Sequence, residues 1–278
     1  MKAFCFSYLF EKADAFLFQL ETLWFQDPAR ALDPSLDFQE MIKRLCTAKI
    51  LAFTQNDFGL WKTKVLCLAG EIHPKIFILG GTDIAFTNED VEDLLETFPS
   101  AYCFISNWLG SHPRCFLLPL GNKTYMEDQQ SGPKQINLCI TYCRPDSQDR
   151  LEFYDFLRQN PSLQTLCAPE LPPVEYNQLL AQSYFSLCCC GNGYDTYRFW
   201  ESLANRSIPI VKSNPFFASL RRQYPHLPFV SIDAWEDLFQ LIPTLTESYW
   251  KSLWSEADTD CLWEPFWDSR LSEIVNTP

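Results

Sequence analysis

Short apolar runs that lack polar–apolar alternation recur along the chain, separated by segments with helical spacing. A strand that is apolar at nearly every position needs cover on both faces, as in a parallel sheet flanked by helices. The repeated order of strand and helix predicts an α/β fold, an open doubly wound sheet with ligands at the carboxyl ends of the strands. The predicted strands are 75–79, 101–106, 115–120, 136–142, 184–189 and 208–212.

Helical segments are predicted between these runs. The first begins with Asn88, Glu89 and Asp90, which place a capping residue and then acids where the helix dipole favours negative charge. The first 45 residues are expected to add helices on the outside of the first half. The predicted helices are 88–97, 147–158, 174–183, 196–204, 216–222 and 234–241.

A polar segment at 122–135 divides the chain into two halves. It has no periodic apolar face and contains the sequence Ser131-Gly132-Pro133, which breaks regular structure. We therefore predict two Rossmann-like domains, residues 1–128 with the extra N-terminal helices and residues 129–278, facing each other across a cleft. The segments expected to border the cleft follow strands and are 81–83, 106–107 and 191–198.

Charge and hydropathy exclude several classes of protein. Lys and Arg number 22 against 35 Asp and Glu, a net charge of −13, so the positive surface that holds a phosphate backbone is missing and no nucleic-acid partner is expected. No run of apolar residues is long enough to span a membrane. The apolar start of the chain is interrupted at Glu11 with no cleavage site after it. These features predict a soluble, cytoplasmic protein.

The cysteines and histidines do not form a metal-binding pattern. The 12 cysteines include no C-x-x-C pair and many lie inside apolar runs, where a free cysteine behaves as a small buried hydrophobic residue. The three histidines lie far apart in the sequence. We therefore predict free thiols and no metal site.

One stretch, 184–211, combines a strand, a glycine loop, a helix and a second strand. The loop holds Gly191, Asn192 and Gly193, and the helix is predicted to open near Asp195. A glycine loop that leads into a helix amino terminus can bind an anion, because free N–H groups and the helix dipole point toward it. Arg198 lies early in this helix, with Glu201 one turn later on the same face. A simple turn followed by a surface ion pair also fits this spacing.

This stretch resembles the carboxyl-terminal signature of the exostosin-like group of GT-B glycosyltransferases. The resemblance extends upstream to Arg150, to Glu175-Tyr176 with Leu179, and to the first-half segments 81–83, 106–107, 112–113 and 118–121, so that it covers roughly residues 75 to 215. The signature positions matched are Phe185, Gly191, Asn192, Gly193, Asp195, Arg198, Trp200, Glu201, Leu203 and the run 208–211.

The resemblance implies a GT-B-like fold and transfer of a sugar from a UDP- or GDP-linked donor, without metal or other cofactor, to a carbohydrate or protein acceptor. It assigns the loop amides of 191–193 and Arg198 to the diphosphate, Glu201 to the ribose, and Asp195 to the donor site as a helix cap. Inverting transfer also needs a base for the acceptor, and Asp83 is the candidate. Asn107 and Arg150 are further cleft candidates.

The chain also departs from the family pattern. Cys190 replaces a proline or small residue, Gly81 replaces an asparagine, and Asn205-Arg206 replaces a small residue and a glycine. Arg206 is either structural or an extra cation near the donor pocket. These departures leave open a second function, a catalytically inactive module that binds carbohydrate or protein.

Two features near the end of the chain have competing explanations. The sequence Asp258-Thr259-Asp260 matches the D-x-D of another glycosyltransferase fold, but it follows a segment predicted to be helical, whereas a metal-binding D-x-D follows a hydrophobic strand. Trp254, Trp263 and Trp267 either line a cleft or belong to a helix that crosses back to close the first domain, and we favour the crossing helix.

Overall fold

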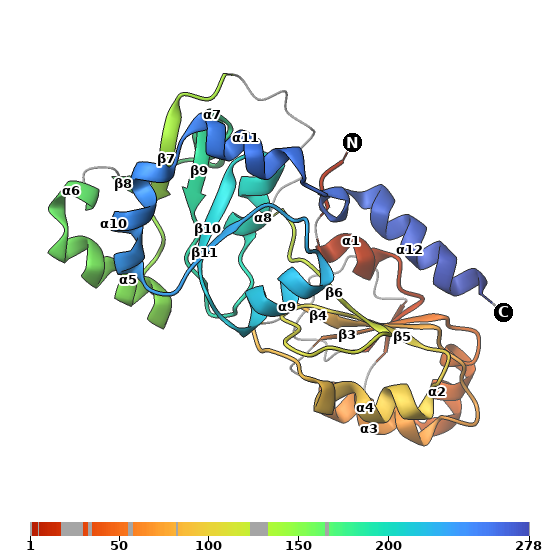
Figure 1. Ribbon diagram of the computed structural model, residues 1–278. Coiled ribbons are helices and arrows are strands. Elements are labelled where there is room, and N and C mark those ends of the chain that lie inside the picture. Colours follow the sequence, from red (N-terminus) through yellow and green to blue (C-terminus); the bar gives the residue numbers. More distant parts are fainter. Residues whose placement is uncertain are drawn as a thin grey trace. The chain divides into compact units, whose positions relative to one another are not determined.

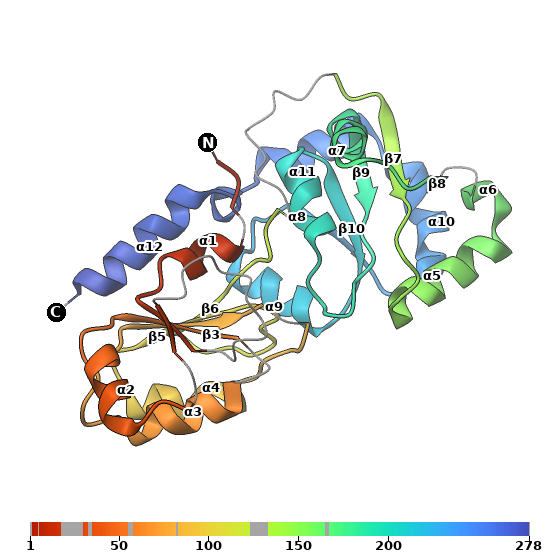
Figure 2. The same ribbon diagram turned by 180° about the vertical axis from the view of Figure 1, so that it is seen from behind.

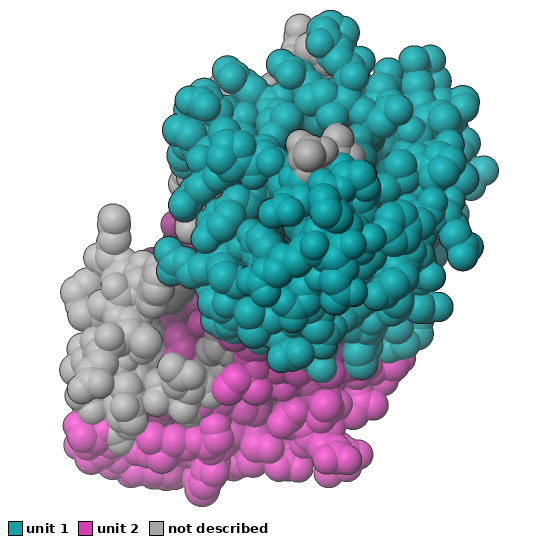
Figure 3. All heavy atoms as spheres, turned by 90° about the vertical axis from the view of Figure 1, so that its left-hand side faces the viewer, with its two compact units in different colours: residues 1–5, 120–264 teal, residues 6–119, 265–278 magenta. Residues whose placement is uncertain are grey.

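The computed structural model describes residues 2–4, 6–17, 30–32, 35–54, 58–81, 83–122, 133–164 and 167–277 (Figure 1). The chain forms two compact units, which Figure 3 shows in different colours. Unit 1 comprises Met1–Cys5 with Leu120–Glu264, and unit 2 comprises Phe6–Pro119 with Pro265–Pro278.

Unit 2 is built on a six-stranded parallel sheet in the order β2-β1-β3-β4-β5-β6. The two middle strands, β3 and β4, are buried at every position, so the sheet needs cover on both faces. Figures 1 and 2 show α2, α3 and α4 beneath the sheet and α1 and α12 above it. The strands are Ala15–Leu17, Ala31–Leu32, Ile50–Thr54, Ile76–Gly80, Tyr102–Ile105 and Cys115–Leu117; the helices are α1 Phe6–Glu11, α2 Phe38–Leu45, α3 Phe58–Cys67, α4 Asn88–Thr97 and α12 Glu264–Asn276.

The last helix, α12, packs on unit 2 although it is distant from that unit in the sequence. The Trp267 and Phe104 rings lie with centroids 6.0 Å apart, and the Tyr8 hydroxyl donates to Asp268 Oδ2 at 2.6 Å. The prediction that the tryptophan-rich end contains a helix closing the first half of the chain is thus confirmed for Trp267.

Unit 1 contains a five-stranded parallel sheet in the order β11-β10-β9-β7-β8. Phe185 on the central β9 is fully buried and pairs in register with Leu138 on β7 and Ile208 on β10. The strands β7 to β11 are Ile136–Thr141, Cys167–Ala168, Ser183–Leu187, Ile208–Lys212 and Val230–Ile232; the α-helices α5 to α11 are Gln148–Gln159, Pro161–Gln164, Pro173–Gln182, Tyr197–Ala204, Pro215–Gln223, Leu238–Leu241 and Glu247–Ser255.

Helices cover the β9 side chains on both sides. Phe185 lies in one core cluster with Phe153 of α5, and its ring stacks on Tyr249 of α11. Just after β9, the thiol of Cys188 contacts the Ser202 hydroxyl of α8 at 3.5 Å. Cys188 and Cys189 are buried and free, as expected of cysteines inside apolar runs.

The strand order of unit 1 reverses beside β7. From β7 the chain passes to β8 on one side, and α7 then returns it to β9 on the other side of β7. The helices that follow β7 and β9 therefore lie on opposite faces of the sheet, which opens a crevice at the carboxyl ends of these two strands. Ligands of open α/β sheets bind at such a reversal.

All six predicted strands are present, and their parallel pairing confirms the α/β class. The helices expected in the first 45 residues are present as α1 and α2, but the region also contributes β1 and β2 to the sheet, which the sequence did not predict. Strands of three and two residues are too short to show a period in the sequence. The strand β3 was also missed.

The expected boundary at residues 128 and 129, and most of the polar segment around it, lie outside the described residues. Each end of the chain belongs to the unit formed mainly by the other half: residues 265–278 belong to unit 2, and residues 1–5 belong to unit 1. The arrangement of two domains across a cleft stays a prediction. In the part of the chain that the structure describes, no helix has the length and apolar character of a membrane span.

Candidate functional site

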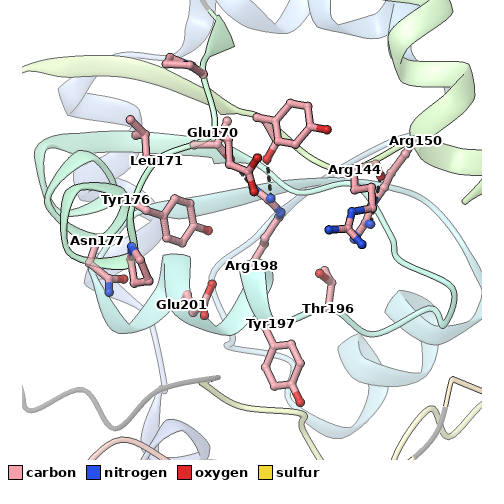
Figure 4. A pocket seen from close by; sticks show the side chains of 14 residues that line it. Arg144, Arg150, Glu170, Leu171, Tyr176, Asn177, Thr196, Tyr197, Arg198 and Glu201 are labelled. Carbon is pink, nitrogen blue, oxygen red and sulfur yellow. Dashed lines mark hydrogen bonds between the residues drawn. The ribbon is translucent and has the colours of Figure 1, made fainter. Parts of the chain in front are cut away.

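A pocket of about 420 Å³ lies in unit 1 at the reversal of the strand order (Figure 4). Its wall is made by residues that follow β7 and β8 and by the first turns of α7 and α8. Three arginines, Arg144, Arg150 and Arg198, share this wall with the carboxylates of Glu170 and Glu201. The pocket therefore occupies the position that the fold makes available to a ligand, and its side chains suit an anionic one.

The amino terminus of α8 adds to the positive character of the pocket. Thr196 is the N-cap residue in extended conformation, and its side chain makes no capping hydrogen bond to the helix. The first turn of α8 carries no acidic residue. Because the first N–H groups of a helix have no partners within it, this end carries a partial positive charge beside Arg198.

Arg198 connects α8 to the end of β7. Its guanidinium donates to the Thr141 hydroxyl and to the Tyr142 carbonyl. The same group lies over the Tyr176 ring, 5.6 Å from its centroid. Half-buried and held on two sides, Arg198 presents its remaining N–H groups in a fixed orientation.

Arg150, on α5, holds the loop that follows β7. Its Nη1 donates to Asp146 Oδ1 at 2.5 Å and to the Arg144 carbonyl at 3.2 Å. A Cβ added at Gly191 meets Arg150 Nη2 at 3.3 Å, so the glycine lets the loop after β9 pass close to this guanidinium. In the view of Figure 4, Arg198 lies between Tyr176 and the other two arginines.

The field of the arginines extends beneath the pocket. Cys143 is buried, and its pKa is lowered to about 7, first by a hydrogen bond with the Cys189 thiol and then by the charges of Arg198 and Arg150, against the effect of burial. Burial, and then the Glu201 charge, raise the pKa of Tyr176. The charge of Arg198 lowers the pKa of both groups, and in Tyr176 it opposes the charge of Glu201.

Asp195 anchors the start of α8 through buried hydrogen bonds outside the pocket. It is buried, and its carboxylate accepts hydrogen bonds from Thr196 N at 2.7 Å, Trp200 Nε1 at 2.7 Å and Leu120 N at 2.8 Å. Burial raises the pKa of Asp195 to about 7, against these hydrogen bonds. The residue does not line the pocket, and the N-cap residue of α8 is Thr196 rather than Asp195, so a role of Asp195 in the donor site stays a prediction.

The glycine loop lies next to the pocket, but none of Gly191, Asn192 and Gly193 lines it. The loop is anchored on the first turn of α5, where Cys190 N donates to Asp149 Oδ2 at 2.8 Å and the Ser147 hydroxyl donates to the Cys190 carbonyl at 3.1 Å. A role for the loop amides in ligand binding stays a prediction.

Two predicted site residues belong to unit 2. Asp83 is exposed and follows β4. Asn107 follows β5, is buried, and has a left-handed backbone with φ of 50°. Its carbonyl accepts from Phe86 N at 3.1 Å. Both residues lie at carboxyl ends of strands, as the sequence predicted.

Sequence reasoning did not single out Arg144, Glu170 or Asn177 as site residues, and it named Tyr176 only within the family pattern. These residues reach the pocket from the loops after β7 and β8 and from α7. The sequence does contain a signal for Arg144: it lies two residues after the strand predicted at 136–142, and Pro145 follows it.

The D-x-D sequence, Asp258-Thr259-Asp260, does not contribute to this pocket. Asp258 follows α11 and Asp260 begins a short 3-10 turn, Asp260–Leu262, so a helix rather than a strand directly precedes the motif. Among the described residues, no group of three or more His, Cys, Asp or Glu side chains is arranged to hold a metal ion.

Arg206 lies at the carboxyl end of α8, whereas the first turn of α8 forms the pocket wall. Its guanidinium stacks over the rings of Trp254 and Trp250, at 5.2 and 5.9 Å from their centroids, and its carbonyl accepts from Trp250 Nε1 at 2.9 Å. The backbone is left-handed, with φ of 57°. Of the two explanations left open by the sequence, these contacts favour the structural one.

We expect Arg206→Gly to change the free energy of unfolding by less than about 1 kcal/mol, because relief of the left-handed backbone, worth about 1 kcal/mol, offsets the lost stacking. Arg206→Ala keeps the strain and loses the stacking, so it is expected to destabilise by about 1 kcal/mol. Urea denaturation of both variants measures the difference. Equal stability of the two variants contradicts this account.

Comparison with known proteins gives distant structural likenesses. No protein-family model matches the chain, and a search of curated proteins finds no match. An α-glucosyltransferase solved in complex with UDP and a 13-mer DNA containing a central A:G mismatch superposes with a TM-score of 0.43 at 11% identity, covering 91% of this chain and 87% of that one. The pneumococcal O-GlcNAc transferase GtfA, solved with UDP and GlcNAc, gives a TM-score of 0.41 at 12% identity, covering 86% of this chain and 55% of that one. Likeness at this level does not bear on what this chain binds.

Proposed function

We propose that the chain is a glycosyltransferase that takes a sugar from a UDP- or GDP-linked donor, with the donor bound in the unit 1 pocket. The observation that carries the proposal is that Arg198 and Glu201 lie on one face of α8 and line a pocket at the reversal of the strand order, which two more arginines also line. A nucleoside diphosphate joins an anionic group to a ribose with two hydroxyls. The pocket offers guanidinium groups for the first and a carboxylate for the second.

The chemistry proposed for this site needs charge compensation at the leaving group. When the acceptor oxygen attacks the anomeric carbon, the bond from that carbon to the diphosphate oxygen breaks and the diphosphate gains negative charge. Guanidinium groups and the amino terminus of α8 stabilise this charge, so we propose that the transfer proceeds without a metal ion. The acceptor loses its proton to a carboxylate, and we propose Asp83 for this role in an inverting reaction.

The remaining parts of the proposal concern family, acceptor and location. The signature around α8 supports an exostosin-like enzyme that acts on a carbohydrate or protein acceptor. The described cysteines are free, which suits a reducing compartment such as the cytoplasm.

Thermal unfolding with UDP and with GDP tests the proposal. At 100 times its dissociation constant, a ligand of the native state adds about 2.7 kcal/mol, which raises the melting temperature by several degrees in a chain of this size. We expect one of the two nucleotides to produce this shift. Absence of a shift with both contradicts the proposal.

A second measurement separates the enzyme from the inactive binding module. UDP- and GDP-sugars are incubated with the protein, and release of the free nucleoside diphosphate is followed. Slow hydrolysis of one donor in the absence of acceptor supports the transferase. Tight nucleotide binding with no release from any donor, with or without carbohydrate acceptors, supports the inactive module.

A further inference from the structure

The three arginines of the pocket differ in how far the protein already uses them. Arg198 donates to Thr141 and Tyr142, and Arg150 donates to Asp146 and to the Arg144 carbonyl. Within the described residues, the guanidinium of Arg144 has no hydrogen bond, ion pair or ring contact. Two of the three cations are thus partly satisfied by the protein, and the third is available to a ligand.

The backbone that carries Arg144 is held on both sides. Cys143 N donates to the Tyr154 hydroxyl at 3.3 Å, and that hydroxyl donates to the Cys143 carbonyl at 2.8 Å. The Arg144 carbonyl accepts from Arg150 Nη1 at 3.2 Å and from Asp146 N at 2.9 Å. Pro145 restricts Arg144 to an extended conformation. A side chain presented from such a segment loses little further backbone freedom when it binds a ligand.

Resting on the proposed function, we propose that Arg144 is a specificity-determining residue that contacts the diphosphate of the donor directly, and that Arg150 and Arg198 also position the segment that carries it. A guanidinium can bind two phosphate oxygens at once, whereas a nucleoside without phosphate offers it no anion. Arg144 therefore favours a nucleoside diphosphate over the matching nucleoside.

The test compares ligands that differ only in phosphate. Wild-type protein is first titrated with UDP and with GDP by calorimetry to find which nucleotide binds more tightly. That nucleotide is then compared with its nucleoside, uridine or guanosine, whose weaker binding is measured by ligand-observed NMR. We expect Arg144→Ala to weaken diphosphate binding roughly 10- to 100-fold, the loss of one charge-assisted contact, and to change nucleoside binding less than about twofold. Arg144→Lys is expected to recover part of the diphosphate affinity.

Arg158→Ala is the matched control. It removes one positive charge from α5, where Arg158 pairs with Asp155 at 2.7 Å on the surface, and it is expected to change neither affinity. Equal diphosphate binding by Arg144→Ala and wild type overturns the inference while leaving the proposed function standing. Equal losses for diphosphate and nucleoside also overturn it, because the residue then acts on the shape of the pocket. If wild-type protein binds neither nucleotide, the proposed function itself fails.

Discussion

Replacing Arg198 with alanine is expected to abolish nucleotide binding and sugar transfer while leaving the chain folded. The substitution removes a charge-assisted contact to the diphosphate, worth roughly 1.5–3 kcal/mol, and also releases Thr141 and Tyr142 at the end of β7. Because both effects act on the same pocket, we expect affinity to fall at least about 100-fold. Isothermal titration with the nucleotide that wild-type protein binds measures this.

Arg198→Lys and Thr141→Val divide the effect into its parts. Lysine keeps the charge but cannot reach Thr141, Tyr142 and the ligand together, so only partial recovery is expected. Thr141→Val keeps the guanidinium and removes one anchor, so a loss of a fewfold is expected. Circular dichroism and thermal unfolding confirm that each variant is folded. Wild-type affinity in folded Arg198→Ala shows that Arg198 is structural and contradicts its role in the donor site.

The sequence predicts the structure best where a site depends on residues that are close together in the chain. Arg198 and Glu201 share a helix face because they are three residues apart, and α8 begins within one residue of the predicted start at 196. Local spacing fixes these relations before any tertiary contact forms. The signature around α8 was therefore informative about one wall of the pocket.

The rest of the pocket depends on which strands become neighbours. Glu170 and Arg144 are 26 positions apart in sequence and line one pocket because β7 and β8 pair in parallel, with Ile140 opposite Cys167. Which strand pairs with which is a long-range property that neither hydrophobic periodicity nor residue spacing encodes. The difference among the arginines is also invisible in sequence, since it depends on whether an acceptor lies within reach of each guanidinium.

Asp195 shows how a residue can belong to a signature without facing the ligand. Its carboxylate holds Leu120, at the start of the long segment of unit 1, against the first turn of α8. The sequence indicated a helix cap but could not indicate Leu120 as a partner, because the two are 75 positions apart. The role predicted for Asp195 involves only residues close to it in sequence, whereas its hydrogen bond with Leu120 N joins distant parts of the chain.

Asp195→Ala is expected to lower the free energy of unfolding by about 3 kcal/mol or more, because it leaves two buried donors, Thr196 N and Trp200 Nε1, and one partly buried donor, Leu120 N, without their acceptor. Asp195→Asn keeps one oxygen but turns an amide nitrogen toward a donor, so a loss of about 1–3 kcal/mol is expected. Urea denaturation measures both. The exposed Asp155→Asn on α5 is the control and is expected to change stability by less than about 0.5 kcal/mol.

The loss of unfolding free energy caused by Asp195→Asn is also expected to depend on pH. Because burial raises the pKa of Asp195 from 3.8 to about 7 in the folded protein, the folded state binds this proton more tightly than the unfolded state does. The stability that follows is fully present below about pH 4 and is lost as the pH rises through 7. Asparagine does not titrate, so the gap between wild type and Asp195→Asn should narrow between pH 5 and pH 8. A gap that stays constant or widens over that range shows that the three hydrogen bonds outweigh burial and keep Asp195 ionised throughout.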